Sequence, residues 1–419
     1  MSMFAISVNR TFVSLRRGAG FPPSFRAFCV LTLLGLSAPA FAQTSFTVVD
    51  LGALVPGQSS TAYTINNSGS VVGVIGAWPN LQAVAWINAT TKPQLVLLGG
   101  RGQNSAAYSV NDAGISVGEI NPTGVQQAIQ FPATRLDTAA GTPPTVFSMA
   151  YNSNANGVVA GVAGLSGDPN PHAVVYNHGS GPIDLGNFGT DVAVAYDIKG
   201  ADTIVGTAAT ARGPSHAFVH NGISRLNQAT DDIGTLGGLQ SEANCVNLAK
   251  EVAGWSDLLC RSSTAVRHIF LWQSGKMRDL GSPFPRLPAT MTTPFGRRAT
   301  VRAVELLTRV PDSSHDGGEC INMRGSDTKE SAPLPPQIVG YAMLYENRFG
   351  GSATCLGFGG NTSFNRAVFF DGTMMHDLND MIPPTSGWYL EQAFGINNAS
   401  QIVGVGRFAG EEHAFLLMP

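Results

Sequence analysis

The sequence predicts an all-β fold, a seven-bladed β-propeller made of four-stranded antiparallel blades. A short phrase recurs about every 47 residues along the chain. Each copy contains four short apolar runs separated by turn residues, which is typical of one blade. The last copy lacks its fourth run, and a matching run stands at 46–52. Pairing the first strand with the last would close the ring and remove two open sheet edges. An open β-solenoid is the competing architecture.

The composition agrees with short strands and gives no indication of nucleic-acid binding. The 419 residues include 49 glycines and 25 prolines, 13% of the residues are charged, and the formal net charge is −3. Low charge with abundant glycine suits short strands joined by tight turns. Nucleic-acid binding would favour a basic balance, which this chain lacks.

Residues 1–42 have the pattern of an export signal. An apolar run at 28–36 leads to the small-residue box Ala40-Phe41-Ala42. Four basic residues precede the run: Arg10, Arg16, Arg17 and Arg26. A membrane anchor is the alternative, but the run is shorter than the roughly 20 residues that a spanning helix needs. We expect cleavage near Ala42, export to the periplasm or beyond, and a single domain over 43–419.

The first strand of each unit, strand A, leads into a turn that carries Asn or Asp. Such a turn, of the Asn-x-x-Gly kind, tolerates positive φ. The expected positions are Ile65-Asn66, Val110-Asn111, Tyr151-Asn152, Tyr196-Asp197, Val246-Asn247, Ile321-Asn322 and Ile396-Asn397. The second strand, B, reaches a repeated glycine at Gly73, Gly118, Gly161, Gly206, Gly254, Gly340 and Gly404.

Two polar positions also recur, one opening strand C and one closing strand D. Strand C opens with His172, His216, His268 or His413, and with Gln82, Gln127 or Arg366 in the other units. Strand D carries Asp50, Asp184, Asp232, Asp279 or Asp377. Because a catalytic residue is needed once, we expect structural roles: the histidines tie a strand to a neighbouring blade or turn, and each Asp caps its loop. The alternatives are a ring of ligands around the channel and a carboxylate pair among the aspartates.

The sixth unit is irregular, with expected insertions at 282–314, 326–336 and 345–365. We expect its strand A at Cys320–Asn322, because this segment repeats Cys245–Asn247. The alternative register places strand A at Val301–Glu305. In the expected register, Cys245 and Cys320 share one position, and Cys260 and Cys355 both follow strand B. The economical pairing is Cys245–Cys260 and Cys320–Cys355; unpaired thiols are the alternative.

The first insertion is rich in arginine and supplies the candidate binding residues. In a propeller the D–A and B–C loops lie on one face, so this loop would lie at a rim suited to ligands. The candidates for an anion or sugar-acid site are Arg297, Arg298, Arg302, His315 and Asp316. A solvated loop without a ligand is the alternative. Residues 312–317 resemble half of a calcium loop, but Met323 stands where a bidentate Glu is needed, so we predict no metal.

The repeated phrase resembles a bacterial extracellular-repeat family named for its His-Ala-Phe signature. The residues that carry the resemblance are Asp232–Gly238, Gly395–Asn398 with Gln401–Gly404, His216–Val219 and His413–Leu416. The resemblance covers nearly all of 43–419 and implies export and a β-repeat fold. It carries over no catalytic set.

These observations favour an exported, non-enzymatic binding module. The expected partner is a glycan, an envelope component or a protein, with neither a cofactor nor a membrane span, and a monomer is favoured. No phosphate-binding loop or zinc-protease motif occurs in the sequence. The alternatives are a polysaccharide hydrolase or lyase that uses carboxylates or His315, and a purely structural role in assembly.

Overall fold

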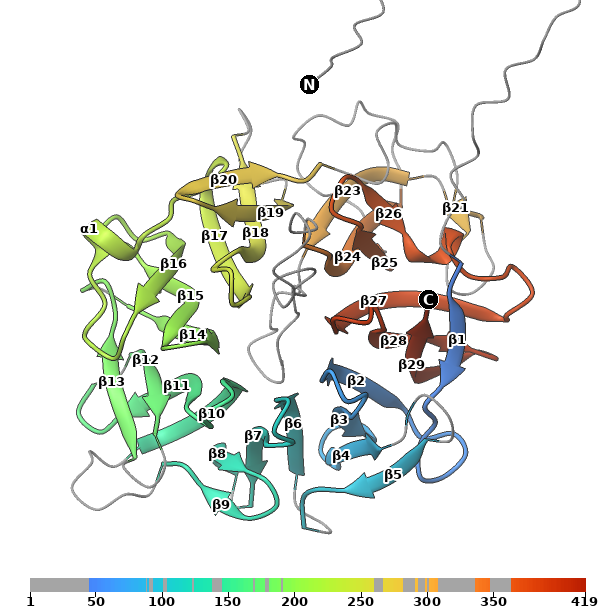
Figure 1. Cartoon of the computed structure of the whole chain (residues 1–419), viewed down its shortest axis with the longest axis horizontal. Helices are drawn as coiled ribbons and strands as arrows, with labels where there is room; N and C mark the ends of the chain where they lie inside the picture. The colour runs from blue at the N-terminus through green and yellow to red at the C-terminus, as the bar shows by residue number, and fades with distance from the viewer. Residues whose placement is uncertain are drawn as a thin grey trace, which may run out of the picture. The chain divides into compact units, whose positions relative to one another are not determined.

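A computed structural model of the chain describes most of the segment from residue 45 to the end (Figure 1). The described residues are 45–87, 89, 93–100, 104–122, 124–137, 145–168, 170–177, 181–189, 191–259, 267–281, 291–292, 298–299, 301–307, 336–346 and 363–419. Only the backbone is described at 145, 291–292, 298–299, 301–307, 344–346 and 363. All of these residues belong to one compact unit, Thr44–Pro419.

Seven antiparallel sheets form a ring, which confirms the predicted seven-bladed β-propeller (Figure 1). Blade 1 contains β2 (Ser60–Ile65), β3 (Val71–Ile75), β4 (Gln82–Ile87) and β5 (Gln94–Leu97); blade 2 contains β6 (Asn104–Val110), β7 (Ser116–Asn121), β8 (Gln127–Gln130) and β9 (Thr134–Arg135). Blade 3 contains β10 (Thr145–Ser153), β11 (Val159–Leu165), β12 (Pro171–Tyr176) and β13 (Pro182–Gly186). In these blades β2, β6 and β10 lie toward the centre, and β5, β9 and β13 lie at the perimeter (Figure 1).

The other half of the ring holds blades 4 to 7. Blade 4 contains β14 (Ala193–Lys199), β15 (Thr203–Ala209) and β16 (Ser215–Asn221); blade 5 contains β17 (Gly237–Val246), β18 (Val252–Leu258), β19 (Arg267–Gln273) and β20 (Lys276–Asp279). Blade 6 contains β23 (Val301–Leu307), β24 (Ile338–Glu346), β25 (Ser363–Phe370) and β26 (Met375–Asp377). Blade 7 contains β27 (Trp388–Ile396), β28 (Ile402–Phe408), β29 (Glu411–Met418) and β1 (Thr47–Asp50). A short extra sheet pairs β21 (Met291–Thr292) with β22 (Arg298–Ala299).

Blade 7 is closed by the first strand of the described chain, as the split last repeat predicts. β1 pairs with β29 from Thr47 opposite Met418 to Asp50 opposite Phe415. The Phe46 N–H also donates to the Met381 carbonyl at 2.8 Å. The open edges of β1 and β29 are therefore joined, and the ring has no gap at the chain ends.

Blade 4 differs from the predicted four strands. Its sheet has three, and the place of the fourth is taken by a single bridge between Phe218 and Asp232. The short helix α1 (Gln228–Asp231) precedes this bridge, and the Asn227 side chain caps it by accepting from the Ala229 N–H. An asparagine at this position favours a helix start over an extended strand.

The expected register of the sixth unit is wrong. Strand A of blade 6 is β23, which pairs with β24 from Val301 opposite Glu346 to Leu307 opposite Tyr341. The alternative register, at Val301–Glu305, therefore holds, and Cys320–Asn322 lies outside the described residues. Six paired residues, with one register shift between Val301 and Ala303, outweigh a three-residue likeness to Cys245–Asn247. The expected insertion at 282–314 therefore contains strand A itself, and residues 326–335 lie outside the described residues.

Two expected turn positions also shift by two residues. The turn of blade 3 begins at Asn154, whose N–H donates to the Val158 carbonyl, and not at Asn152. In blade 4 the equivalent residue is Lys199, opposite Thr203, and not Asp197. The turn residue follows three positions after Tyr151 and Tyr196, as it does after Tyr63 and Tyr108, so aligning Tyr151-Asn152 and Tyr196-Asp197 with Ile65-Asn66 places the turn two residues too early. A β-bulge four residues before the turn is shared by blades 1 to 5 and blade 7 and does not distinguish these two blades.

The repeated glycine of strand B is required by close packing inside each blade. A Cβ atom at Gly73 would lie 2.0 Å from the Thr61 carbonyl oxygen, and one at Gly404 would lie 2.0 Å from that of Gln392. The same clash recurs at Gly118, Gly161, Gly206 and Gly254. The glycine therefore marks where strands A and B approach each other most closely. None of the described helices is long and apolar enough to cross a membrane.

Candidate functional site

In five blades the recurring basic residue of strand C pairs with the aspartate of strand D or, in blade 4, with the aspartate of the bridge that takes its place. The His216 Nδ1 atom lies 2.9 Å from an Asp232 carboxylate oxygen. The other pairs are His172–Asp184 (2.8 Å), His268–Asp279 (2.8 Å), His413–Asp50 (3.0 Å) and Arg366–Asp377. A basic side chain meets the strand-D carboxylate in each of these five blades, so the arrangement repeats around the ring.

The same aspartates hold the loop that follows strand D. The Gly234 N–H donates to Asp232 at 2.8 Å, and the Gly52, Gly186 and Gly281 N–H groups donate to Asp50, Asp184 and Asp279. Burial opposes ionisation of Asp232, but the hydrogen bonds from His216 and Gly234 hold its pKa below the ordinary value. Hydrogen bonds from His268 and Gly281 lower the pKa of Asp279 in the same way, again against burial.

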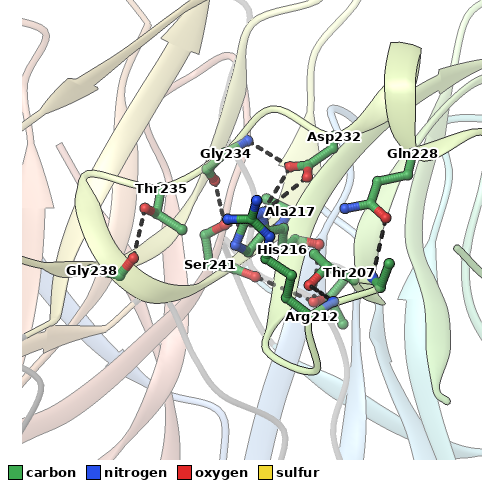
Figure 2. A network of polar contacts seen from close by, with 12 residues as sticks. Thr207, Arg212, His216, Ala217, Gln228, Asp232, Gly234, Thr235, Gly238 and Ser241 are labelled. Atoms are coloured by element: carbon green, nitrogen blue, oxygen red, sulfur yellow. Dashed lines mark hydrogen bonds and ion pairs between the residues drawn. The ribbon is translucent and has the colours of Figure 1, made fainter. Parts of the chain in front are cut away.

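Neighbouring blades are joined at this level by serines that sequence reasoning missed. Figure 2 shows Ser241 of blade 5 beside His216 and Asp232 of blade 4. Its Oγ atom accepts from the Ala217 N–H at 2.8 Å and donates to the Gly234 carbonyl. Ser60, Ser105 and Ser148 accept from Ala414, Ala83 and Ala128 in the same way. The sequence signal that could have identified these serines is their recurrence near the start of strand A. This repeated network stabilises the scaffold.

The predicted binding residues of the sixth unit are mostly outside the described part. Arg298 lies on β22 and Arg302 on β23, with only the backbone described, and Arg297, His315 and Asp316 lie outside the described residues. Cys245 is buried on β17. Cys260, Cys320 and Cys355 also lie outside, so the disulfide pairing stays a prediction.

A cavity opens instead at the A–B turns, at one mouth of the central channel. Its volume is about 270 Å³. The turns of blades 1 to 5 and blade 7 contribute to its wall. Among the described residues, the lining carries two charged ones, Asp112 and Lys199. Its remaining polar residues are Thr64, Asn66, Asn67, Ser109, Asn111, Asn152, Ser153, Asn154, Asn247, Asn397 and Asn398.

Four asparagine side chains each donate a hydrogen bond to the next blade beside this cavity. We refer to them, Asn397, Asn66, Asn111 and Asn154, as the asparagine belt. The Asn397 Nδ2 atom donates to the Asn66 carbonyl at 3.1 Å, and Asn66 donates to the Asn111 carbonyl at 3.0 Å. Asn111 donates to the Asn154 carbonyl at 2.8 Å, and Asn154 donates to the Gly200 carbonyl at 3.3 Å. Each Oδ1 atom accepts from its own turn, as Asn66 does from Ser70. The belt therefore fixes both the turns and the cavity wall.

A second set of polar side chains lies on strand A, two residues before the turn residue, in blades 2 to 4. The Ser109 hydroxyl donates to Asn152 at 2.6 Å, and the Asn152 amide donates to Asp197 at 2.7 Å. Asp197 is fully buried and also accepts from the Val246 N–H of blade 5 at 2.8 Å. Blades 2 to 5 are thus joined through this buried carboxylate.

Beside these polar residues, strand A carries a row of buried aromatic rings. Ring centroids lie 5.7 Å apart for Phe394 and Tyr63, 5.9 Å for Tyr63 and Tyr108, 5.8 Å for Tyr108 and Tyr151, and 5.3 Å for Tyr151 and Tyr196. The row is continuous over five blades, and Asn244 follows on the next strand A. Each such aromatic pair contributes about 0.5–1.5 kcal/mol beyond its area burial, so the row stabilises the inner strands of these blades.

Comparisons with known proteins identify no relative by sequence. No family model matches the chain, and a search of curated proteins also found no match. Among solved structures, the β-propeller domain of the Trilobed protease from Pyrococcus furiosus, which has an open velcro topology, is similar to 86% of this chain over 84% of its own length. The sequence identity is 8% and the TM-score is 0.27. A likeness at this level carries no argument about function.

Proposed function

We propose that this chain is an exported, non-catalytic β-propeller of the His-Ala-Phe repeat type, which binds a glycan in the cavity at the A–B turns. The observation that carries the proposal is the lining of that cavity, in which neutral amides and hydroxyls predominate over charged groups. Amides and hydroxyls both donate and accept hydrogen bonds, so they match the hydroxyl groups of a sugar.

The rigidity of the wall supports the same proposal. The asparagine belt holds the turns before any ligand arrives, as the bond from Asn111 to Asn154 shows. A preorganised site loses little side-chain entropy on binding. Neutral groups held in place suit recognition, whereas proton transfer needs a positioned acid or base. The export part of the proposal is supported by the leader-like pattern of residues 1–42.

A glycan array followed by calorimetry on the bound sugars tests this proposal. Ala155 is exposed on an A–B turn and lines the cavity, so Ala155→Trp should obstruct it. We expect this change to weaken glycan binding by at least about tenfold, which corresponds to 1.4 kcal/mol. Ala211→Trp is the matched control, because Ala211 is exposed on a B–C loop, away from the A–B turns.

Release of reducing ends from the bound sugar is measured in parallel. Binding without turnover, lost in Ala155→Trp and kept in Ala211→Trp, supports the proposal. The proposal fails if no glycan binds, if both variants bind as the natural chain does, or if the sugar is cleaved.

A further inference from the structure

Among the described A–B turns, that of blade 4 interrupts the asparagine belt. Asn66, Asn111, Asn154, Asn247 and Asn397 each begin an A–B turn by donating an N–H to the carbonyl four residues on. Blade 4 has Lys199 in this register, opposite Thr203. A lysine has no amide with which to continue the belt. The cavity wall therefore has one place, between blades 4 and 5, that differs chemically from the rest.

Lys199 presents a hydrogen-bond donor at this place. Its ammonium lies 3.2 Å from the Asp197 carboxylate, and its side chain is 29% exposed. Asp197 also accepts from Asn152 and from the backbone N–H groups of Ile198 and Val246. The carboxylate would thus stay hydrogen-bonded while the ammonium, which carries three N–H groups, also contacts a ligand.

Asn247 presents an acceptor next to this donor. In blades 1 to 3 the equivalent carbonyl accepts twice: that of Asn111 accepts from Gly114 and from the Asn66 side chain. The Asn247 carbonyl accepts from the Lys250 N–H, and the preceding blade supplies no belt asparagine. A carbonyl has two lone pairs, so the Asn247 carbonyl can accept one further hydrogen bond.

Leu248 adds an apolar surface between the two turns. Its side chain is 58% exposed, and its Cδ2 atom would lie 3.5 Å from a Cβ atom placed on Gly200 of blade 4. Lys199, Gly200, Asn247 and Leu248 all line the cavity. We refer to these four residues as the belt gap.

We propose, resting on the glycan-binding role above, that the belt gap recognises the acetamido group of an N-acetylated amino sugar. The acetamido carbonyl accepts from Lys199, its N–H donates to the Asn247 carbonyl, and its methyl group packs on Leu248. The acetamido group thereby supplies the bond between blades that an asparagine supplies elsewhere in the belt. A hydroxyl at the same sugar position offers no methyl group to pack on Leu248.

The test compares two tetrasaccharides with the same β-1,4 linkage, chitotetraose and cellotetraose, which differ in an acetamido or a hydroxyl group at each C2 position. We expect the natural chain to bind chitotetraose at least about tenfold more tightly by calorimetry. Leu248→Ser and Lys199→Asn should reduce this preference to within about twofold, which is under 0.5 kcal/mol. Leu239→Ser is the control, since Leu239 is an exposed leucine on β17 outside the cavity.

The outcomes separate this inference from the proposed function. Equal affinity for the two sugars, or binding only of glycans without acetamido groups, overturns the acetamido assignment and leaves glycan binding intact. Tight binding of an N-acetylated peptide without preference for chitotetraose also overturns it. If no glycan binds, both proposals fail. Leu248→Ser keeps the test valid if Lys199→Asn does not fold, because Leu248 is exposed.

Discussion

Two buried glutamates are the least expected individual residues in this ring. Glu242 accepts from the Asn244 amide at 2.8 Å and from the Tyr196 hydroxyl at 3.4 Å. Glu119 lies against Tyr108 in blade 2. Burial raises the pKa of each carboxyl from 4.5 to about 7, although neighbouring hydrogen bonds oppose the shift. Both side chains are therefore protonated when the folded protein is in mildly acidic solution.

These glutamates predict that stability falls as the pH rises. Between pH 4.5 and about 7 the folded state holds protons that the unfolded state has released, so deprotonation favours unfolding. Each carboxyl should account for up to about 3 kcal/mol over this range. Urea unfolding at pH 5 and pH 8 should show this loss, and Glu242→Gln should reduce it. The exposed Glu411→Gln is the control, and an equal effect of both changes would contradict the assignment.

Single residues of this kind could not be predicted from the sequence. The histidine and aspartate positions were readable because they recur, and repetition reveals a shared register. Glu119, Glu242 and Lys199 each occur once, so their surroundings depend on which strand lies opposite. Asn154 and Lys199 stand two residues beyond the expected turn positions, because Asn152 and Asp197 resemble the turn residue of the other blades. The belt gap could not be predicted from the sequence, because it depends on the strand register that the hydrogen bonds define.

At the scale of elements, the A–B turns share one strained backbone position. The fourth residue of the turn has positive φ, and it is glycine in blades 1 to 3: Gly69, Gly114 and Gly157. Blades 4, 5 and 7 place Asp202, Lys250 and Ser400 there, with φ of 61°, 61° and 59°. A side chain in this region costs roughly 1–2 kcal/mol.

We expect Lys250→Gly to stabilise the protein by about 0.5–1 kcal/mol, after the extra chain entropy of glycine is subtracted. Lys250 loses only an exposed hydrogen bond to Asn221. Ser400→Gly should be neutral or destabilising, because the Ser400 hydroxyl donates to Gln337 in a buried contact at 2.8 Å. Urea unfolding of both variants measures the difference. A gain for Ser400→Gly that equals or exceeds that for Lys250→Gly would refute the explanation.

Strands were predictable as elements wherever turn chemistry and repetition agreed. Most blades follow the expected order of four strands. Blade 6 misled the prediction because a Cys-Ile-Asn likeness at 320–322 competed with the longer strand Val301–Leu307. Blade 4 lacks its last strand because Asn227 starts a helical turn there. The local cap at Asn227 therefore determines the structure of blade 4, and long-range strand pairing determines that of blade 6, in both cases against the pattern of the repeat.

For the whole molecule, the junction of the first and last strands determines whether the ring closes. Phe46 precedes β1, is 1% exposed, and packs edge-to-face on Phe369 at a centroid distance of 6.0 Å. It belongs to a cluster that includes Leu378, Leu390 and Phe415. A residue outside the regular repeat thus connects blade 7 to blade 6.

We expect Phe46→Ala to destabilise the protein by about 3–5 kcal/mol, the usual cost of emptying a buried aromatic site. Val55→Ala is the control, because Val55 is 58% exposed and should change stability by less than about 0.5 kcal/mol. Urea unfolding measures both. A loss below about 1 kcal/mol for Phe46→Ala would show that the ring tolerates a weakened junction.

The pairing of β1 with β29 also determines how the molecule responds to mechanical tension. Thr47 lies opposite Met418, so the backbone enters β1 and leaves β29 at the same end of their ladder. A force that pulls the two termini apart therefore peels the strands one rung at a time, beginning at Thr47 and Met418. Peeling loads one pair of hydrogen bonds at once, whereas shear would load all of them together. The ring should consequently open under a small force at this seam, before the other blades are strained.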